Sequence, residues 1–151
     1  MTNSTSSQQS NLKILQLEDL DANIQKILRI AVETRENAYC PYSKFQVGAA
    51  VLCADGSMYG GCNIENVSFT VGTCAERVAY GKAISDGKRN FTAVAVVGSM
   101  EFTSPCGACR QYISEFGYVD VYIACPNLKK IAVTSIEALL PCAFKRTDNP
   151  F

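Results

Sequence analysis

Three cysteines and one glutamate stand at spacings that suit a metal centre. Cys74 is followed two residues later by Glu76, and Cys106 and Cys109 form a C-x-x-C pair downstream. The chain contains no histidine, so a zinc site built here must use thiolates. Three ligands would leave one coordination position open to water. Such a position beside a carboxylate is the minimum apparatus for the attack of hydroxide on an electrophilic carbon.

Predicted helices bring these sulfurs together. Cys106 and Cys109 are three residues apart at the start of a predicted helix, which places both sulfurs on one side of its first turn. The amino end of a helix favours thiolate over thiol, and Cys74 lies at the start of another predicted helix. We therefore expect two helix N-termini to converge on one cation. Glu76 does not share a helix face with Cys74, so its carboxylate is expected on the water side of the ion.

Other interpretations of these cysteines remain open from the residues alone. One is a structural zinc site whose fourth ligand would be Cys53, Cys62 or Cys125. Another is a thioredoxin-like redox pair of Cys106 and Cys109, which would leave the first cysteine and the glutamate unexplained. A third is a chance grouping of buried thiols. The remaining five cysteines are expected to pack as small core residues: Cys40, Cys53, Cys62, Cys125 and Cys142.

Composition indicates the class of protein. The 151 residues are enough for one domain that buries roughly 68–70% of its unfolded surface without disulfides. We find no signal segment and no apolar run that would span a bilayer, so we expect no membrane partner and a reducing, cytoplasmic setting for the eight cysteines. A formal net charge of zero argues against a nucleic-acid partner. The basic pairs Lys129-Lys130 and Lys145-Arg146 are expected to be solvated surface.

Hydrophobic periodicity predicts the elements that position the site. Residues 1–11 are almost all Ser, Thr, Asn and Gln, so we expect a disordered tail over 1–15 and one domain over 16–151. The spacing of apolar residues and turn signals such as Asp55-Gly56 predict the helices and strands of the remaining chain. The predicted helices cover 21–39, 73–86, 106–117 and 135–140, and the predicted strands cover 46–54, 57–63, 91–98, 120–125 and 131–134. This order indicates an α/β protein with one mixed five-stranded sheet and helices on its faces.

Four motifs of the chain carry a resemblance to a known family. They are Phe45-Gln46-Val47-Gly48-Ala49-Ala50, Gly61-Cys62-Asn63-Ile64-Glu65-Asn66, Cys74-Ala75-Glu76-Arg77 and Pro105-Cys106-Gly107-Ala108-Cys109-Arg110-Gln111. The combination of C-x-E with P-C-x-x-C is a known signature of zinc-dependent nucleobase deaminases. Together the four motifs resemble those of the cytidine deaminases, and the resemblance extends from the first predicted helix to about Phe144. It is to the small homotetrameric class that holds zinc with three cysteines, and it implies a three-layer α/β/α cytidine-deaminase-like fold.

The resemblance also implies a reaction. A zinc hydrolase of this family converts cytidine or 2′-deoxycytidine and water to the uridine analogue and ammonia, in pyrimidine salvage. Cys74, Cys106 and Cys109 would hold one Zn²⁺ per chain, and Glu76 would move protons.

The substrate residues come from the resemblance as well. Asn63 and Glu65 would hydrogen-bond the ribose, and the Ala75 N–H would meet the pyrimidine carbonyl. Phe45 would pack on the nucleoside, and Phe144 would enter the site of a neighbouring subunit in a homotetramer. The residues alone favour core or terminal packing for both phenylalanines. Phe69 stands where the family often has a tyrosine, which leaves no polar role at that position.

Arg77 follows Glu76 directly and is a candidate partner for the thiolates. Three thiolates on Zn²⁺ carry a net charge of −1, which weakens the metal as a Lewis acid. A cation beside the sulfurs would restore that acidity, and the alternative for Arg77 is a surface arginine of a helix. Two further functions remain open: deamination of another cytosine-bearing substrate, such as a nucleoside antibiotic or a polynucleotide base, and a non-catalytic structural zinc module.

Overall fold

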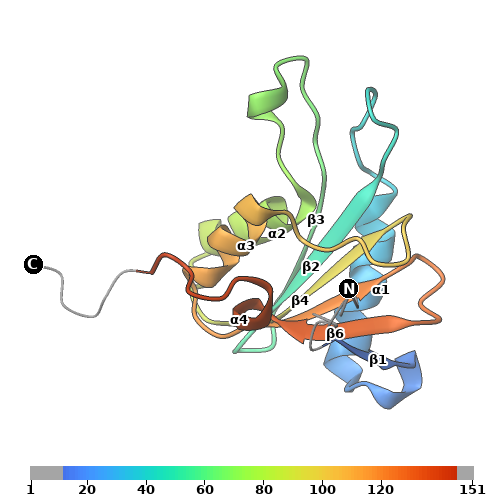
Figure 1. Cartoon of the computed structure of the whole chain (residues 1–151), viewed down its shortest axis with the longest axis vertical. Coiled ribbons are helices and arrows are strands. Elements are labelled where there is room, and N and C mark those ends of the chain that lie inside the picture. The colour runs from blue at the N-terminus through green and yellow to red at the C-terminus, as the bar shows by residue number, and fades with distance from the viewer. Residues whose placement is uncertain (1–11, 146–151) are drawn as a thin grey trace, which may run out of the picture.

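A six-stranded mixed sheet forms the centre of the fold in the computed structural model, which describes residues 12–145 (Figure 1). The strands lie in the order β1-β6-β5-β4-β2-β3. β4 and β5 are parallel, and the other neighbours are antiparallel. The strands are β1 (Lys13–Leu15), β2 (Val47–Cys53), β3 (Met58–Cys62), β4 (Phe91–Gly98), β5 (Asp120–Ala124) and β6 (Ile131–Ser135).

Helices cover both faces of this sheet (Figure 1). α1 (Ala22–Arg35) packs on one face, and its start is capped by Asp21, whose carboxylate accepts from the Asn23 N–H. The other face carries α2 (Ala75–Ser85), α3 (Gly107–Ser114) and α4 (Ile136–Leu139). Two short 3-10 turns complete the list, η1 (Leu17–Asp19) and η2 (Phe69–Val71). The expected three-layer α/β/α architecture is confirmed.

The central strand β4 shows why the layers hold together. Its side chains alternate between the two faces, as the period of a strand requires. Val94 and Val96 pack under α2 and α3, whereas Ala95 and Val97 pack under α1. All four are fully buried, so the strand contributes to both apolar cores. Burial on both faces explains its continuous apolar sequence.

Two expectations at the edges need correction. The sheet has six strands rather than five, because Lys13–Leu15 pairs with β6 along the edge, so the expected disordered tail does not reach residue 15. The rest of that tail, residues 1–11, lies outside the described residues. α1 ends at Arg35 rather than at residue 39, because Tyr39 instead pairs with Ile64 in an isolated bridge. Within residues 12–145 no helix combines the length and apolarity needed to cross a membrane.

Candidate active site

Two helix N-termini bring three sulfurs together. Cys74 and Cys106 occupy the N-cap positions of α2 and α3, and Cys109 lies in the first turn of α3. The three Sγ atoms lie within 4.8 Å of one another, and those of Cys74 and Cys106 are 3.8 Å apart. Neither N-cap sulfur caps its own helix, so both remain free to face the cluster.

This donor set fits a zinc ion. Thiolates are soft ligands that select zinc among common divalent metals. Tetrahedral zinc with Zn–S bonds of about 2.3 Å places its sulfurs about 3.8 Å apart. The Cys74–Cys106 distance of 3.8 Å agrees with that spacing. The residues present therefore suit a zinc centre with three protein ligands.

A structural four-cysteine site gains no support from the described part of the chain. The potential metal-binding group found there consists of Cys74, Cys106 and Cys109, with no fourth member. Cys53 is buried in the core under α2, and the Cys125 thiol donates to the Met100 carbonyl. Three protein ligands would leave the fourth coordination position of a bound zinc ion to water or substrate.

Neighbouring hydrogen-bond donors stabilise negative charge on the Cys74 sulfur. The pKa of Cys74 is lowered to about 5, chiefly by a hydrogen bond from the Cys109 thiol and to a smaller extent by bonds from Arg77 and Cys106. The same Cys109–Cys74 bond, together with burial, raises the pKa of Cys109. Arg77 Nη2 lies 3.8 Å from the Cys74 sulfur. Three sulfurs this close can all be thiolates only with a cation among them, because like charges raise one another's pKa.

Glu76 lies in the wall of a small cavity beside the sulfurs. Its side chain is 4% exposed, and burial is the main cause that raises its pKa. A carboxyl group in such surroundings is suited to give and take protons near neutral pH. The cavity has a volume of about 170 Å³. It is lined by Val47, Asn63, Cys74, Ala75, Glu76, Thr103, Ser104 and Cys106.

Ala75 places a backbone donor at the same cavity. It is the first residue of α2 and is fully buried. Its N–H is among the four that an α-helix leaves without an intrahelical partner. A carbonyl group in the cavity could accept from that donor.

Two glycines let the walls of the cavity approach one another. A Cβ at Gly61 of β3 would lie 2.5 Å from the Ala79 nitrogen and 2.6 Å from the Ala75 oxygen, so β3 packs directly on α2. A Cβ at Gly98 would lie 2.2 Å from the Thr103 hydroxyl oxygen. Glycine at the end of β4 therefore lets the next loop fold back and bring Thr103 to the cavity.

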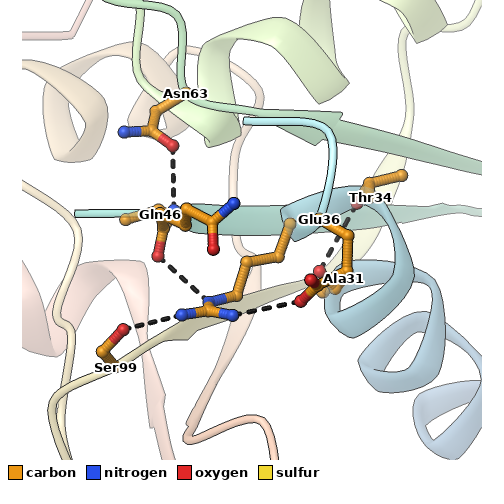
Figure 2. A network of polar contacts seen from close by, with 8 residues as sticks. Ala31, Thr34, Glu36, Gln46, Asn63 and Ser99 are labelled. Atoms are coloured by element: carbon orange, nitrogen blue, oxygen red, sulfur yellow. Dashed lines mark hydrogen bonds and ion pairs between the residues drawn. The ribbon is translucent and has the colours of Figure 1, made fainter. Parts of the chain in front are cut away.

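Asn63 holds the chain that enters β2. Its Oδ1 accepts from the Val47 N–H at 2.8 Å, and its Nδ2 donates to the Phe45 carbonyl at 2.8 Å. Figure 2 shows the amide of Asn63 pointing at this segment, with Gln46 beside it. Arg35 holds the same segment from α1, because its Nε donates to the Gln46 carbonyl at 3.1 Å. The Asn63 amide still has one lone pair and one N–H for a ligand.

Arg35 also reaches the end of β4. Its Nη2 donates to the Ser99 hydroxyl at 2.7 Å, and Ser99 appears at the far side of the network in Figure 2. One guanidinium therefore ties the segment before β2 to the loop after β4. Both lead into the cavity wall, through Val47 and through Thr103.

Glu65, two residues after Asn63, also binds backbone N–H groups of a neighbouring loop. Its carboxylate accepts from the backbone N–H of Tyr42 at 3.0 Å and from the hydroxyl and N–H of Ser43. The Ser43 hydroxyl is the main cause that lowers the pKa of Glu65. Glu65 lines a second cavity of about 420 Å³ with Tyr42, Ser43, Asn66, Phe69 and Gly72.

The predicted aromatic contacts lie outside the small cavity. Phe45 is half-buried, and the ring of Phe144 is 87% exposed, with neither among the lining residues. Phe69 is 81% exposed on the segment that projects between β3 and α2 (Figure 1). Within the described chain, the sulfurs, Glu76, Ala75 and Asn63 thus come together, while Glu65, Phe45 and Phe144 are not among the residues that line this cavity.

Several residues of the site were not singled out from the sequence. Thr103 and Ser104 line the cavity, Arg35 holds the segment that enters its wall at Val47, and Ser43 holds Glu65. The two cavity residues directly precede the P-C-x-x-C motif, which is the signal that could have indicated them. Arg35 and Ser43 contact partners at least 11 residues away in sequence, and no local pattern marks such contacts.

Comparisons with known proteins identify the family of this chain. The family described as the cytidine and deoxycytidylate deaminase zinc-binding region matches residues 21–125. A cytidine deaminase of Sporosarcina psychrophila is 51% identical over 130 residues, covering 83% of this chain and 94% of that protein. The crystal structure of a cytidine deaminase from Burkholderia pseudomallei is similar with a TM-score of 0.75 and 43% identity, covering 79% of this chain and 97% of that one. A blasticidin-S deaminase of Bacillus cereus is 32% identical over 113 residues, covering 69% of this chain and 80% of that protein. The chain therefore belongs to the cytidine deaminase family.

Proposed function

We propose that this protein is a zinc-dependent hydrolase that converts cytidine and 2′-deoxycytidine to uridine and 2′-deoxyuridine with release of ammonia. The observation that carries the proposal is the cluster of three sulfurs at two helix N-termini, two of which line one cavity together with Glu76. The reaction recovers pyrimidine nucleosides and belongs to salvage. The thiolates must stay reduced, which suits the cytoplasm.

The metal site would be formed by Cys74, Cys106 and Cys109, with one zinc per chain. A bound zinc ion supplies Lewis acidity that lowers the pKa of water to about 7. Arg77 stabilises the negative charge of the cluster through its contact with the Cys74 sulfur.

Glu76 moves the protons of the reaction. It accepts a proton from the attacking water, gives one to ring N3, and helps to protonate the departing amino group. The water oxygen forms a bond to C4, and the bond from C4 to the exocyclic amino nitrogen breaks. Cytidine and water thereby become uridine and ammonia. Burial of Glu76 keeps bulk water from competing for these protons.

Other residues bind and orient the nucleoside. The Ala75 N–H donates to the pyrimidine carbonyl, and Asn63 and Glu65 bind ribose hydroxyls with their remaining hydrogen-bonding capacity. Phe45 packs on the nucleoside, held by the bond between its carbonyl and Asn63.

We propose further that the enzyme is a homotetramer with shared sites. The cavity of about 170 Å³ is smaller than the roughly 300–1,000 Å³ usual for ligand pockets. Phe144 is 87% exposed and so is free to cover part of a neighbour's substrate. A second subunit would enlarge and close the site.

The test is ultraviolet monitoring of cytidine with purified, zinc-loaded protein, with ammonia measured in parallel. We expect one ammonia per uridine formed. Free cytosine should be a poor substrate, because a site that binds ribose hydroxyls rejects a ligand without them. Equal efficiency on cytosine and cytidine would contradict the ribose assignment.

A second candidate substrate is a cytosine-bearing antibiotic, which the similarity to a blasticidin-S deaminase favours. Blasticidin S belongs in the same substrate panel as cytidine and 2′-deoxycytidine. Higher efficiency on the antibiotic than on either nucleoside would replace the first proposal.

A further inference from the structure

Arg110 follows the predicted zinc ligand Cys109 directly and makes three hydrogen bonds around the site. Its Nε donates to the Pro105 carbonyl at 2.8 Å, and its Nη2 donates to the Ser104 hydroxyl at 2.9 Å. Its Nη1 donates to the Leu139 carbonyl at 2.8 Å. All three nitrogens of the guanidinium are therefore used.

The first two bonds hold the turn that presents Cys106. The Pro105 carbonyl belongs to the same planar peptide unit as the Cys106 nitrogen, so a bond to that oxygen restricts how the Cys106 backbone can rotate. Ser104 lines the cavity beside Glu76. The Arg110 side chain thus contacts the cavity wall directly at Ser104 and reaches the predicted metal ligand Cys106 through Pro105.

The third bond ties this turn to the C-terminal segment. Leu139 ends α4, and the next residue of α3, Gln111, donates from Nε2 to the Phe144 carbonyl at 2.7 Å. Two consecutive residues of α3 therefore hold the chain from Leu139 to Phe144 against the helix that carries two of the sulfurs. The partners are 29 and 33 residues away in sequence.

We propose that Arg110 is a positioning residue for the metal centre, which fixes the Ser104–Pro105 turn and anchors it to the C-terminal segment. Arginine suits this task because its planar fork donates in several fixed directions at once. A lysine ammonium could not span the same three acceptors. The inference rests on one part of the proposed function, namely that the three sulfurs hold zinc.

The test is the rate at which zinc-loaded protein releases its metal to a colorimetric chelator. Arg110→Met should release zinc about tenfold faster than the wild type, in line with the 10–100-fold losses of metal affinity seen when residues that orient ligands are replaced. At saturating zinc, its KM for cytidine should rise more than its kcat falls. Ser104→Ala, which removes one bond only, should raise KM without changing zinc release.

Arg89→Met is the matched control. Arg89 Nη1 also donates to two backbone carbonyls, those of Ile84 and Lys88, but beyond the far end of α2 from Cys74. Its zinc release should equal that of the wild type. Should Arg110→Met fail to fold, Arg110→Lys carries the test, with an intermediate release rate expected.

The proposal is overturned if a folded Arg110 variant releases zinc at the wild-type rate, or if Arg89→Met releases it equally fast. Zinc release needs no nucleoside. Fast release from the variant, with no cytidine turnover by the wild type, would therefore support the positioning role while refuting the proposed reaction.

Discussion

At the scale of single residues, the main feature of the site is the number of acidic groups close together. Three thiolates and one carboxylate share a small, partly buried space, and each would raise the pKa of the others. The N-termini of α2 and α3 and the Arg77 guanidinium are the positive partners that the chain itself provides. A divalent cation completes the balance and turns an unfavourable cluster into a binding site.

Glu76→Gln tests whether chemistry can be separated from metal binding. The amide has almost the same shape, so we expect normal folding and full zinc content. Turnover of cytidine should fall by about 10²–10⁴-fold, because general acid–base catalysis contributes that much and one group serves several proton transfers here. Absorbance assays and zinc analysis on the same preparation give both values. Near-normal turnover in this variant would contradict the assignment.

At the scale of elements, the site depends on how closely β3 approaches α2. Gly61→Ala should lower the free energy of unfolding by about 1–3 kcal/mol, the usual cost of overpacking. The new methyl group would meet the backbone of α2 at Ala75 and Ala79, so it should also weaken zinc binding by displacing Cys74. Urea unfolding and zinc release measure the two effects.

Gly81→Ala, in the helix that Gly61 packs against, is the control for that change. Nothing lies within 4 Å of a Cβ at Gly81, and alanine is favoured over glycine in a helix by about 0.5–1 kcal/mol. This variant should be slightly more stable than the wild type and bind zinc normally. If Gly61→Ala behaved like Gly81→Ala, the close approach would have no role in holding the site.

Local patterns in the sequence predicted most of these elements but not their edges. The apolar run of β4 was predicted over 91–98, where the strand is found, because a strand buried on both faces is continuously apolar. β1 was missed because three residues beside a polar tail carry no periodic signal, and its pairing with β6 joins residues about 120 apart.

The metal ligands could be predicted because C-x-E and P-C-x-x-C are local patterns at helix starts. The hydrogen bonds that Asn63 and Glu65 make to residues 42–47 could not be predicted, because they join residues 16–23 positions apart in the sequence. The same holds for the contact between Arg110 and Leu139. Only the three-dimensional structure shows that these side chains hydrogen-bond to backbone groups distant in the sequence.

At the scale of the whole molecule, apolar side chains remain exposed on the segment that leads from β3 to α2. Val67, Phe69 and Val71 are 80%, 81% and 61% exposed on the segment that projects between β3 and α2 (Figure 1). Tyr42 of the neighbouring loop contacts Phe69 edge to face, with ring centroids 6.0 Å apart. Exposed apolar groups of this kind often mark interfaces, which supports the proposed self-association.

Phe144→Ala tests whether the exposed ring serves a neighbouring subunit. The variant keeps the bond between its backbone carbonyl and Gln111, so only the ring is lost. We expect a higher KM for cytidine, by about 10–100-fold for the loss of one large buried contact, with zinc content unchanged. Deletion of residues 144–151 should in addition loosen assembly, as measured by light scattering at several concentrations. A fully active monomer at micromolar concentration would rule out shared sites.

The central claim is that three cysteines hold one catalytic zinc, and a titration tests it most directly. Metal-free protein, kept reduced, is given zinc in steps while cytidine turnover is followed by absorbance. Activity should rise linearly and reach its plateau at one zinc per chain. Cys106→Ser should bind no zinc tightly and stay inactive, while Cys125→Ser should behave as the wild type. Full zinc binding without turnover, or a plateau that Cys106→Ser also reaches, would contradict the account.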